Sequence, residues 1–239
     1  MSLEIEVVDD PARACSAMLV GAAARGGHIA LAGGSTPKAA YGELVAAVRA
    51  VGVDLSDTTF WFGDERCVAP DDDRSNFRMV KESLLDPLGD LCRAQVRRIK
   101  GELGPQGAAD DYERQLRDEG RLEFELVLLG LGPDGHTASL FPDQESLSIR
   151  SRLAFGVPEP GLEPFVPRVT LTLPALAASR RVVFLATGAG KAEAVRAAFA
   201  PGARPDPHVP ASLLVPEARA ITVLLDRPAA QKLERGEQP

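Results

Sequence analysis

The residues with the clearest capacity for chemistry are Asp134 and His136, two positions apart in a glycine-rich loop. The loop follows the apolar run Phe124 to Leu129, a pattern typical of a buried strand that ends at the glycines. Open α/β sheets bind ligands beyond the carboxyl ends of their strands. The chain has only three histidines, and imidazole titrates near neutral pH. We therefore interpret His136 as a candidate general base and Asp134 as the acid that orients it.

The same loop also matches a dinucleotide-binding pattern, G-x-G-x-x-G, through Gly130, Gly132 and Gly135. The pattern requires a long helix at the third glycine, but Pro142 follows seven residues later. Asp134 would also place a carboxylate where the cofactor's phosphates belong. No strand–helix–strand unit with a ribose-binding acid follows at the usual spacing. We reject a dinucleotide site and expect no cofactor.

A second loop, from Gly33 to Pro37, has the composition of a phosphate site. It follows the expected strand His28 to Ala32 and opens a helix, with Thr36 suited to the N-cap and Pro37 to the first helical position. Ordinary capping would explain those two residues. Two adjacent glycines, Gly33 and Gly34, and a second hydroxyl, Ser35, exceed that need. Free amides at a helix start favour phosphate.

A third loop, Thr187 to Lys191, also joins an expected strand to a helix. It is half of a P-loop, but Ala192 replaces the hydroxyl that would hold Mg²⁺, and the first glycine is missing. A nucleotide is therefore not expected. The alternative is a glycine turn with a solvated lysine. Two such loops in one sheet favour a charge-assisted bond from Lys191 to a substrate phosphate.

Two arginines are further candidates for anion binding. Asp64-Glu65-Arg66 follows the expected strand Thr58 to Phe62, so Arg66 could hold an anion bidentately at a carboxyl strand end. A solvated charge triplet is the alternative. Arg168, directly before another expected strand, is a similar candidate with a weaker signal.

Metal and covalent chemistry are not expected. His28, His136 and His208 are far apart, and no metal-ligand spacing of His or Cys occurs. The chain lacks the nucleophile elbow G-x-S-x-G, and we interpret Ser139 as a structural helix residue. His28 is expected near the start of a strand, and His208 in a solvated proline-rich loop.

Strand and helix patterns alternate along the chain, which predicts an α/β, Rossmann-like layered fold with a mainly parallel central sheet flanked by helices. We expect a single domain over residues 1–239. The expected strands are Ile5 to Val8, His28 to Ala32, Thr58 to Phe62, Phe124 to Leu129, Val169 to Leu173, Val182 to Ala186 and Ile221 to Leu225. The expected helices are Pro11 to Arg25, Pro37 to Ala50, Asn76 to Leu85, Gly107 to Glu119, Lys191 to Phe199 and Ala229 to Leu233.

The composition limits the classes of partner and the cellular compartment that we expect for the protein. The formal charge of −7 and pI of about 5.1 argue against nucleic-acid binding, so local cations must capture an anionic substrate. Three isolated cysteines suggest reduced thiols in a cytoplasm. The N-terminus lacks a signal-peptide pattern, and no apolar window reaches membrane-spanning length. We expect a cytoplasmic monomer or small homo-oligomer.

Taken together, these motifs resemble the 6-phosphogluconolactonase family, within the wider superfamily of glucosamine-6-phosphate isomerases. The match runs in order over nearly the whole chain. The segments that carry it are Gly33 to Pro37, Gly63 to Val68 with Ser75-Asn76, Gly130 to Asp143, Arg168 to Thr170 with Leu173-Pro174, Thr187-Gly188 with Gly190-Lys191, and Pro210 to Ser212.

The resemblance implies hydrolysis of 6-phospho-D-glucono-1,5-lactone to 6-phosphogluconate, the second step of the oxidative pentose phosphate pathway. It implies His136 as the base and a phosphorylated sugar lactone as the ligand. The groups around that substrate would be Gly33, Gly34, Ser35, Thr36, Asp64, Arg66, Arg168 and Lys191. Isomerase relatives carry a glutamate near the place of Phe141, which disfavours the alternative of a sugar-phosphate isomerase or deaminase. A non-catalytic sugar-phosphate sensor, which would not need His136, is the other alternative.

Overall fold

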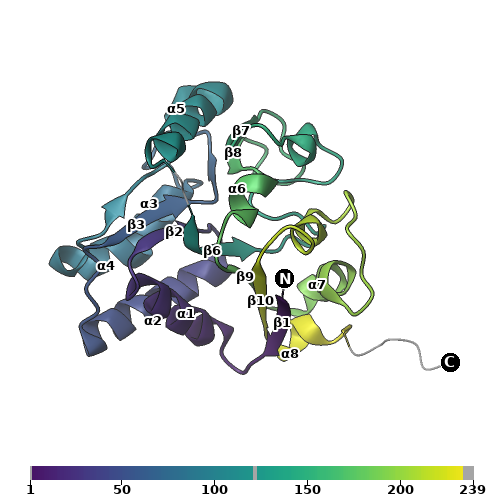
Figure 1. Cartoon of the computed structure of the whole chain (residues 1–239), viewed down its shortest axis with the longest axis horizontal. Coiled ribbons are helices and arrows are strands. Elements are labelled where there is room, and N and C mark those ends of the chain that lie inside the picture. Colours follow the sequence, from purple (N-terminus) through teal and green to yellow (C-terminus); the bar gives the residue numbers. More distant parts are fainter. Residues whose placement is uncertain (1, 121–122, 234–239) are drawn as a thin grey trace.

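The structure, a computed structural model, describes residues 2–120 and 123–233. Its centre is a sheet of seven parallel strands in the order β1-β10-β9-β6-β2-β3-β5 (Figure 1). The strands are β1 Ser2–Val7, β2 Gly27–Leu31, β3 Thr58–Phe62, β5 Gln95–Val96, β6 Phe124–Gly130, β9 Val182–Ala186 and β10 Ala220–Leu225. All five residues of β9 are buried, as expected for a strand covered on both faces.

The strand order creates a topological switch point between β2 and β6. From β2 the chain continues outward to β3 and β5, whereas from β6 it continues in the opposite direction to β9 and β10. The loops after β2 and β6 therefore diverge and leave a crevice at the carboxyl ends of these strands. These loops are the predicted phosphate loop and the loop of Asp134 and His136.

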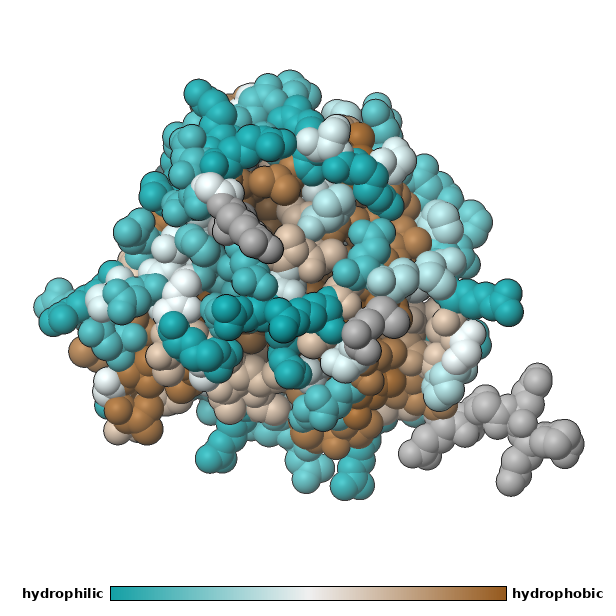
Figure 2. Space-filling view, viewed as in Figure 1, coloured by the Kyte–Doolittle hydropathy of each residue, from teal (hydrophilic) through white to brown (hydrophobic). Residues whose placement is uncertain are grey.

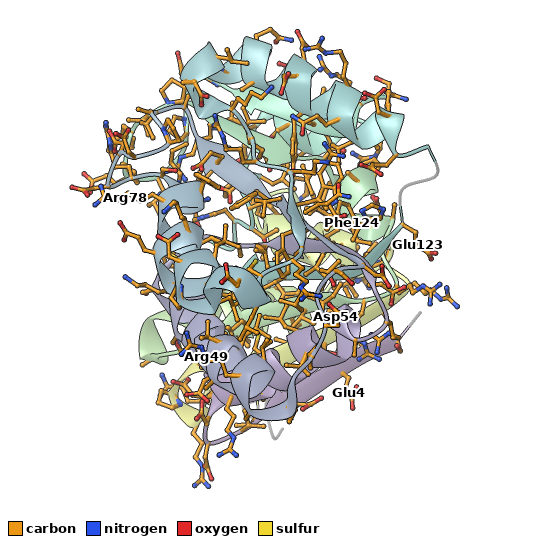
Figure 3. All side chains as sticks on the ribbon, turned by 90° about the vertical axis from the view of Figure 1, so that its left-hand side faces the viewer. Glu4, Arg49, Asp54, Arg78, Glu123 and Phe124 are labelled. Atoms are coloured by element: carbon orange, nitrogen blue, oxygen red, sulfur yellow. The ribbon has the colours of Figure 1, made fainter. Side chains whose placement is uncertain are left out.

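Helices flank the central sheet. Asp10 is the N-cap of helix α1 (Pro11–Ala23), and its carboxylate accepts the Arg13 amide at 3.0 Å. The helix packs against α2 (Ser35–Val51) and the sheet. The remaining helices are α3 Asn76–Val80, α4 Asp86–Leu88, α5 Gly104–Asp118, α6 Leu173–Ala177, α7 Ala192–Phe199 and α8 Arg227–Ala230. Charged side chains such as Arg49 and Arg78 project outward, whereas Phe124 is fully buried (Figure 3).

A second, three-stranded antiparallel sheet was not predicted. It contains β4 (Asp64–Arg66), β8 (Arg168–Leu171) and β7 (Ala154–Val157), and α5 packs on β7 and β8. The sequence predicted no separate strand at Asp64 to Arg66, but these residues pair with β8 after a one-residue break at Gly63. Three-residue strands are too short to show a pattern of alternating polarity.

The Rossmann-like layered fold predicted from the sequence is confirmed, and each predicted strand and helix has a counterpart within a few residues in the described part of the chain. The predicted helix Asn76 to Leu85 is formed by α3 and a π-helical turn from Lys81 to Leu85. Polar side chains cover much of the face shown in Figure 2, with apolar patches between them. None of the described helices has the length and apolarity needed to cross a bilayer.

Candidate active site

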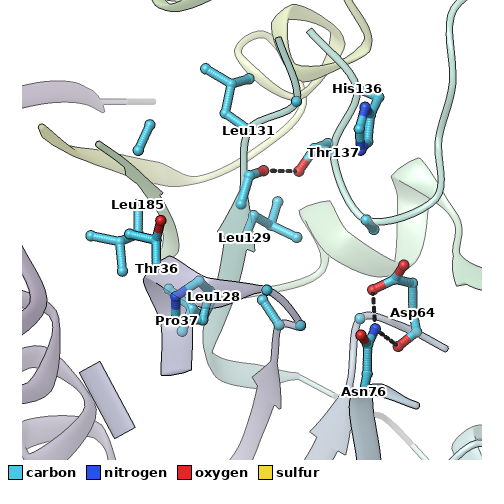
Figure 4. Close-up of a pocket in the computed structure, with 18 of the residues that line it drawn as sticks. Thr36, Pro37, Asp64, Asn76, Leu128, Leu129, Leu131, His136, Thr137 and Leu185 are labelled. Atoms are coloured by element: carbon cyan, nitrogen blue, oxygen red, sulfur yellow. Dashed lines mark hydrogen bonds between the residues drawn. The ribbon is translucent and has the colours of Figure 1, made fainter. Parts of the chain in front are cut away.

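A cavity of about 280 Å³ lies at the switch point (Figure 4). The structure brings nine of the ten predicted site residues to its lining: Gly33, Gly34, Ser35, Thr36, Asp64, Arg66, His136, Arg168 and Lys191. The tenth, Asp134, lies behind His136. They come from the loops after β2, β6 and β9 and from both strands β4 and β8, so five separate segments meet at one place.

Asp134 and His136 form a close pair. The Asp134 Oδ1 lies 2.6 Å from the His136 Nδ1 and also accepts the His136 amide at 3.2 Å. A carboxylate at Nδ1 holds the proton on that nitrogen, which leaves the lone pair of Nε2 available to accept a proton. The two-residue spacing did not establish this contact, and the structure supplies it.

Gly132 makes room for that pair. A Cβ atom at this position would lie 2.0 Å from the His136 Nδ1 and 2.4 Å from the Asp134 Oδ1, far inside van der Waals contact. Only glycine lets the backbone pass so close to the two side chains. This glycine therefore has a steric purpose at the acid–histidine pair, and not in binding a pyrophosphate.

Two charged groups near the histidine have shifted pKa values. Burial raises the pKa of Asp134, but the hydrogen bond and charge of His136 outweigh it, so the pKa lies below its ordinary value. Burial lowers the pKa of Lys191, and the nearby Asp134 carboxylate partly opposes that effect. Lys191 is thus a partly desolvated cation beside the acid–histidine pair.

The phosphate loop after β2 differs from the prediction in one respect. The N-cap of α2 is Gly34, whose φ of 102° is readily adopted only by glycine, and the helix begins at Ser35. Thr36 was therefore wrongly predicted as the N-cap, and Pro37 as the first helical position. Thr36 lies in the first turn, where its hydroxyl is 3.2 Å from that of Thr187 and joins the loops after β2 and β9.

The first amides of α2 face the cavity region without helical partners. The first intrahelical bond joins the Lys38 amide to the Gly34 carbonyl at 3.1 Å, and Pro37 has no amide hydrogen. The amides of Ser35 and Thr36 precede that bond. The positive end of a 17-residue helix is thereby directed at the cavity, an arrangement that favours an anion.

Arg66 and Arg168 are directly opposite each other in the antiparallel pair of β4 and β8. Like charges in this position repel, and the Nε of each is buried without a hydrogen-bond partner in the part of the chain that the structure describes. Burial lowers the pKa of Arg168, Asp64 opposes this, and Arg66 lowers it further. An anion in the cavity that these two residues line would relieve the repulsion between their guanidinium groups.

Asp64 is held by two neighbours. Its carboxylate accepts the Asn76 Nδ2 at 3.0 Å and the Ser139 hydroxyl at 2.6 Å (Figure 4, for Asn76). The expectation that Ser139 is a helix residue was wrong: it lies in a turn, fully buried, where its amide donates to the Thr170 hydroxyl at 3.2 Å. Asp64 is therefore fixed at the cavity wall with part of its hydrogen-bonding capacity already used.

Glu65 was not predicted as a site residue, and it organises this wall. Its buried carboxylate accepts the amides of Arg66, Asn76 and Phe77, each at 2.7 Å, and the Ser75 hydroxyl at 3.0 Å. These bonds tie β4 to the start of α3. Sequence analysis could not find the bonds to Ser75, Asn76 and Phe77, because these residues lie ten to twelve positions away, beyond the range of a local sequence pattern.

The other histidines lie outside the site, as expected. His28 is the second residue of β2, where its Nδ1 accepts the Trp61 indole N–H at 3.0 Å. His208 is 71% exposed and lies 2.8 Å from an Asp143 oxygen. Across residues 2–120 and 123–233, no three His, Cys, Asp or Glu side chains gather in a way that could hold a metal ion.

Fold and site together define a Rossmann-like α/β protein with an acid–histidine pair beside a cavity lined by cationic side chains at the switch point. The family model of glucosamine-6-phosphate isomerases/6-phosphogluconolactonase matches residues 4–223. The chain belongs to this family.

Named relatives agree with this assignment. The chain is 38% identical to a 6-phosphogluconolactonase of Homo sapiens, covering 93% of this chain and 86% of that protein. It is 39% identical to one of a Synechocystis species, covering 87% and 85%. The crystal structure of 6-phosphogluconolactonase from Leishmania guyanensis superposes with a TM-score of 0.81 at 28% identity, over 97% of this chain and 98% of that one.

Proposed function

We propose that this chain hydrolyses 6-phospho-D-glucono-1,5-lactone to 6-phosphogluconate, the second step of the oxidative pentose phosphate pathway. The observation that carries the proposal is the Asp134–His136 contact of 2.6 Å at a cavity that Arg66, Arg168 and Lys191 also line. The relatives that share most of the chain are named for this activity.

In the proposed mechanism, His136 Nε2 removes a proton from water as the water oxygen bonds to the lactone carbonyl carbon. Asp134 stabilises the resulting imidazolium. The tetrahedral intermediate then collapses, the bond from the carbonyl carbon to the ring oxygen breaks, and His136 returns its proton to that oxygen. Loop amides or a nearby cation stabilise the oxyanion. A lactone is an activated ester, so neither a metal nor a covalent nucleophile is required.

The substrate phosphate is proposed to bind the α2 amides of Ser35 and Thr36 together with Arg66, Arg168 and Lys191. Gly33 and Gly34 let the loop approach it closely, and Asp64 is proposed to contact the sugar end. We further propose that the protein acts in the cytoplasm as a monomer or small homo-oligomer without nucleic acid. The absence of a nucleic-acid partner is supported by the basic cluster of Arg97, Arg98 and Lys100. These side chains are paired with the carboxylates of Glu119, Glu102 and Asp111, respectively.

The test compares fresh 6-phosphogluconolactone with unphosphorylated gluconolactone, with spontaneous hydrolysis subtracted at each pH. Lys191→Ala should raise KM for the phosphorylated lactone by about 10- to 150-fold, since one charge-assisted bond contributes about 1.5–3 kcal/mol. The unphosphorylated lactone should be a far poorer substrate. Equal kcat/KM for the two lactones would refute the phosphate assignment. Turnover of glucosamine 6-phosphate would favour the isomerase. Binding of the phosphorylated lactone without turnover would favour the sensor.

A further inference from the structure

Phe141 lies directly behind the proposed active site, although it does not line the cavity. It is 1% exposed and follows the acid–histidine loop by five residues. Its ring contacts two residues with different proposed roles, the base and a phosphate-binding arginine. No charge or hydroxyl on Phe141 takes part in the reaction, so any contribution must act through these neighbours.

The contact with His136 is ring to ring. The two centroids are 4.8 Å apart, with an angle of 38° between the planes. Asp134 fixes the imidazole through its Nδ1 only. One hydrogen bond leaves the imidazole free to tilt about that contact, and the neighbouring ring restricts the tilt. The direction of Nε2 therefore depends on Phe141 as well as on Asp134.

The contact with Arg168 is a cation–π interaction, with the guanidinium carbon 5.5 Å from the ring centroid. The Nη2 of the same guanidinium donates to the carbonyls of Leu162 and Pro164, each at 3.0 Å. These contacts hold the guanidinium in one plane. Because Arg168 is one of the residues that line the cavity, these contacts fix a cation at the cavity wall.

Gly161 lies against a further part of the ring. A Cβ on Gly161 would approach the Phe141 ring to 3.2 Å, closer than most side-chain contacts. The ring is thus enclosed by the acid–histidine loop, by Arg168 and by the segment that includes Gly161. A displacement of the ring would be transmitted to both the base and the arginine, because close-packed side chains leave no space to absorb it.

We propose that Phe141 is a positioning residue that fixes His136 and Arg168 relative to each other, so that the distance between base and phosphate site matches one substrate. This inference rests on the proposed lactonase function. The competing explanation is that Phe141 only fills space in the core. The two differ in what a substitution changes: positioning affects kcat and KM, whereas core filling affects stability alone.

Phe141→Leu removes the aromatic face and keeps an apolar side chain. We expect kcat to fall by about 10- to 100-fold through the misdirected base, since a displacement of about 1 Å can cost 100-fold. We expect KM to rise by about 3- to 30-fold through the loss of the cation–π contact. The matched control is Phe199→Leu: Phe199 is 2% exposed and packs on Phe184 at 4.8 Å, outside the cavity lining. It should lose stability with unchanged kinetics.

Double-mutant cycles separate the two effects. In a His136→Ala background, Phe141→Leu should change kcat by less than about twofold, and in an Arg168→Ala background it should leave KM unchanged. If Phe141→Leu does not fold, Gly161→Ala replaces it in the test. The added methyl group would press on the Phe141 ring from an exposed segment, so kcat should fall and KM should rise. Two results with an active wild type would overturn the inference. One is a Phe141→Leu variant that loses stability with unchanged kinetics, as Phe199→Leu should. The other is a pair of double-mutant cycles in which the effects of the two substitutions simply add. An inactive wild type would instead refute the lactonase function.

Discussion

Substitution of Gly132 by alanine should disable the enzyme without unfolding it. The added Cβ would lie 2.0 Å from the His136 Nδ1, whereas ordinary contacts begin at 3.4 Å, so the imidazole or the backbone must move by about 1.4 Å. The Asp134 Oδ1, at 2.4 Å from the same Cβ, must move as well. The 2.6 Å bond between the two side chains cannot survive both shifts. Because a displacement of about 1 Å can cost 100-fold, kcat should fall by at least about 100-fold.

The phosphate site does not include Gly132, so KM should change by less than about threefold. Gly132 does not have a left-handed φ, so alanine brings no backbone strain, and thermal unfolding should resemble that of wild type. Initial rates with fresh lactone, corrected for spontaneous hydrolysis, give both constants. Gly42→Ala is the control, since Gly42 is an exposed residue of α2 outside the cavity lining and its Cβ would meet nothing within 4 Å. A Gly132→Ala enzyme within about threefold of wild-type kcat would refute the steric argument.

Three other perturbations test separate parts of the account. His136→Ala should lower kcat by about 10²–10⁴-fold, while calorimetric binding of 6-phosphogluconate changes less than about threefold; unaltered turnover would remove the histidine from the mechanism. Exhaustive chelation and dialysis should leave turnover intact, and activity restored by Zn²⁺ would disprove metal independence. Burial lowers the pKa of His28 below its ordinary value. The unfolded state therefore binds the proton more readily, and the urea unfolding free energy should fall as pH drops below about 6.5. His28→Gln should flatten that dependence, and an equally steep profile would contradict it.

The sequence predicted the part of the site that depends on strand ends. Glycine-rich loops after buried strands predicted that the proposed phosphate loop, the acid–histidine loop and Lys191 would lie together, because parallel strands bring their carboxyl ends to one edge of the sheet. The position of Arg66 opposite Arg168 could not be predicted from the sequence. It depends on the antiparallel pairing of β4 and β8, two short strands about a hundred residues apart in the chain.

Local geometry was also beyond the sequence. Thr36 is a residue type favoured at the N-cap, but Gly34, with its positive φ, is the actual N-cap, so the helix begins at Ser35. Ser139 follows His136 closely, as a helix residue would, yet Ala138 has a φ of 48° and turns the chain so that Ser139 reaches Asp64. Both errors come from backbone angles that tertiary contacts impose, and residue type alone does not reveal them.

An acidic protein can bind a phosphorylated substrate because the relevant field is local. The formal charge of −7 is spread over the surface, where water and salt screen it, while Arg168 and Lys191 are partly or fully buried beside the cavity. Burial weakens their solvation and so strengthens their attraction for an anion that enters the cavity. The buried carboxylates of Asp64 and Glu65 lower the cost of keeping Arg66 and Arg168 together before the substrate arrives. Because Asn76, Ser139 and several amides already bond to those carboxylates, the carboxylates only partly neutralise the two arginines, which line the cavity and attract the phosphate.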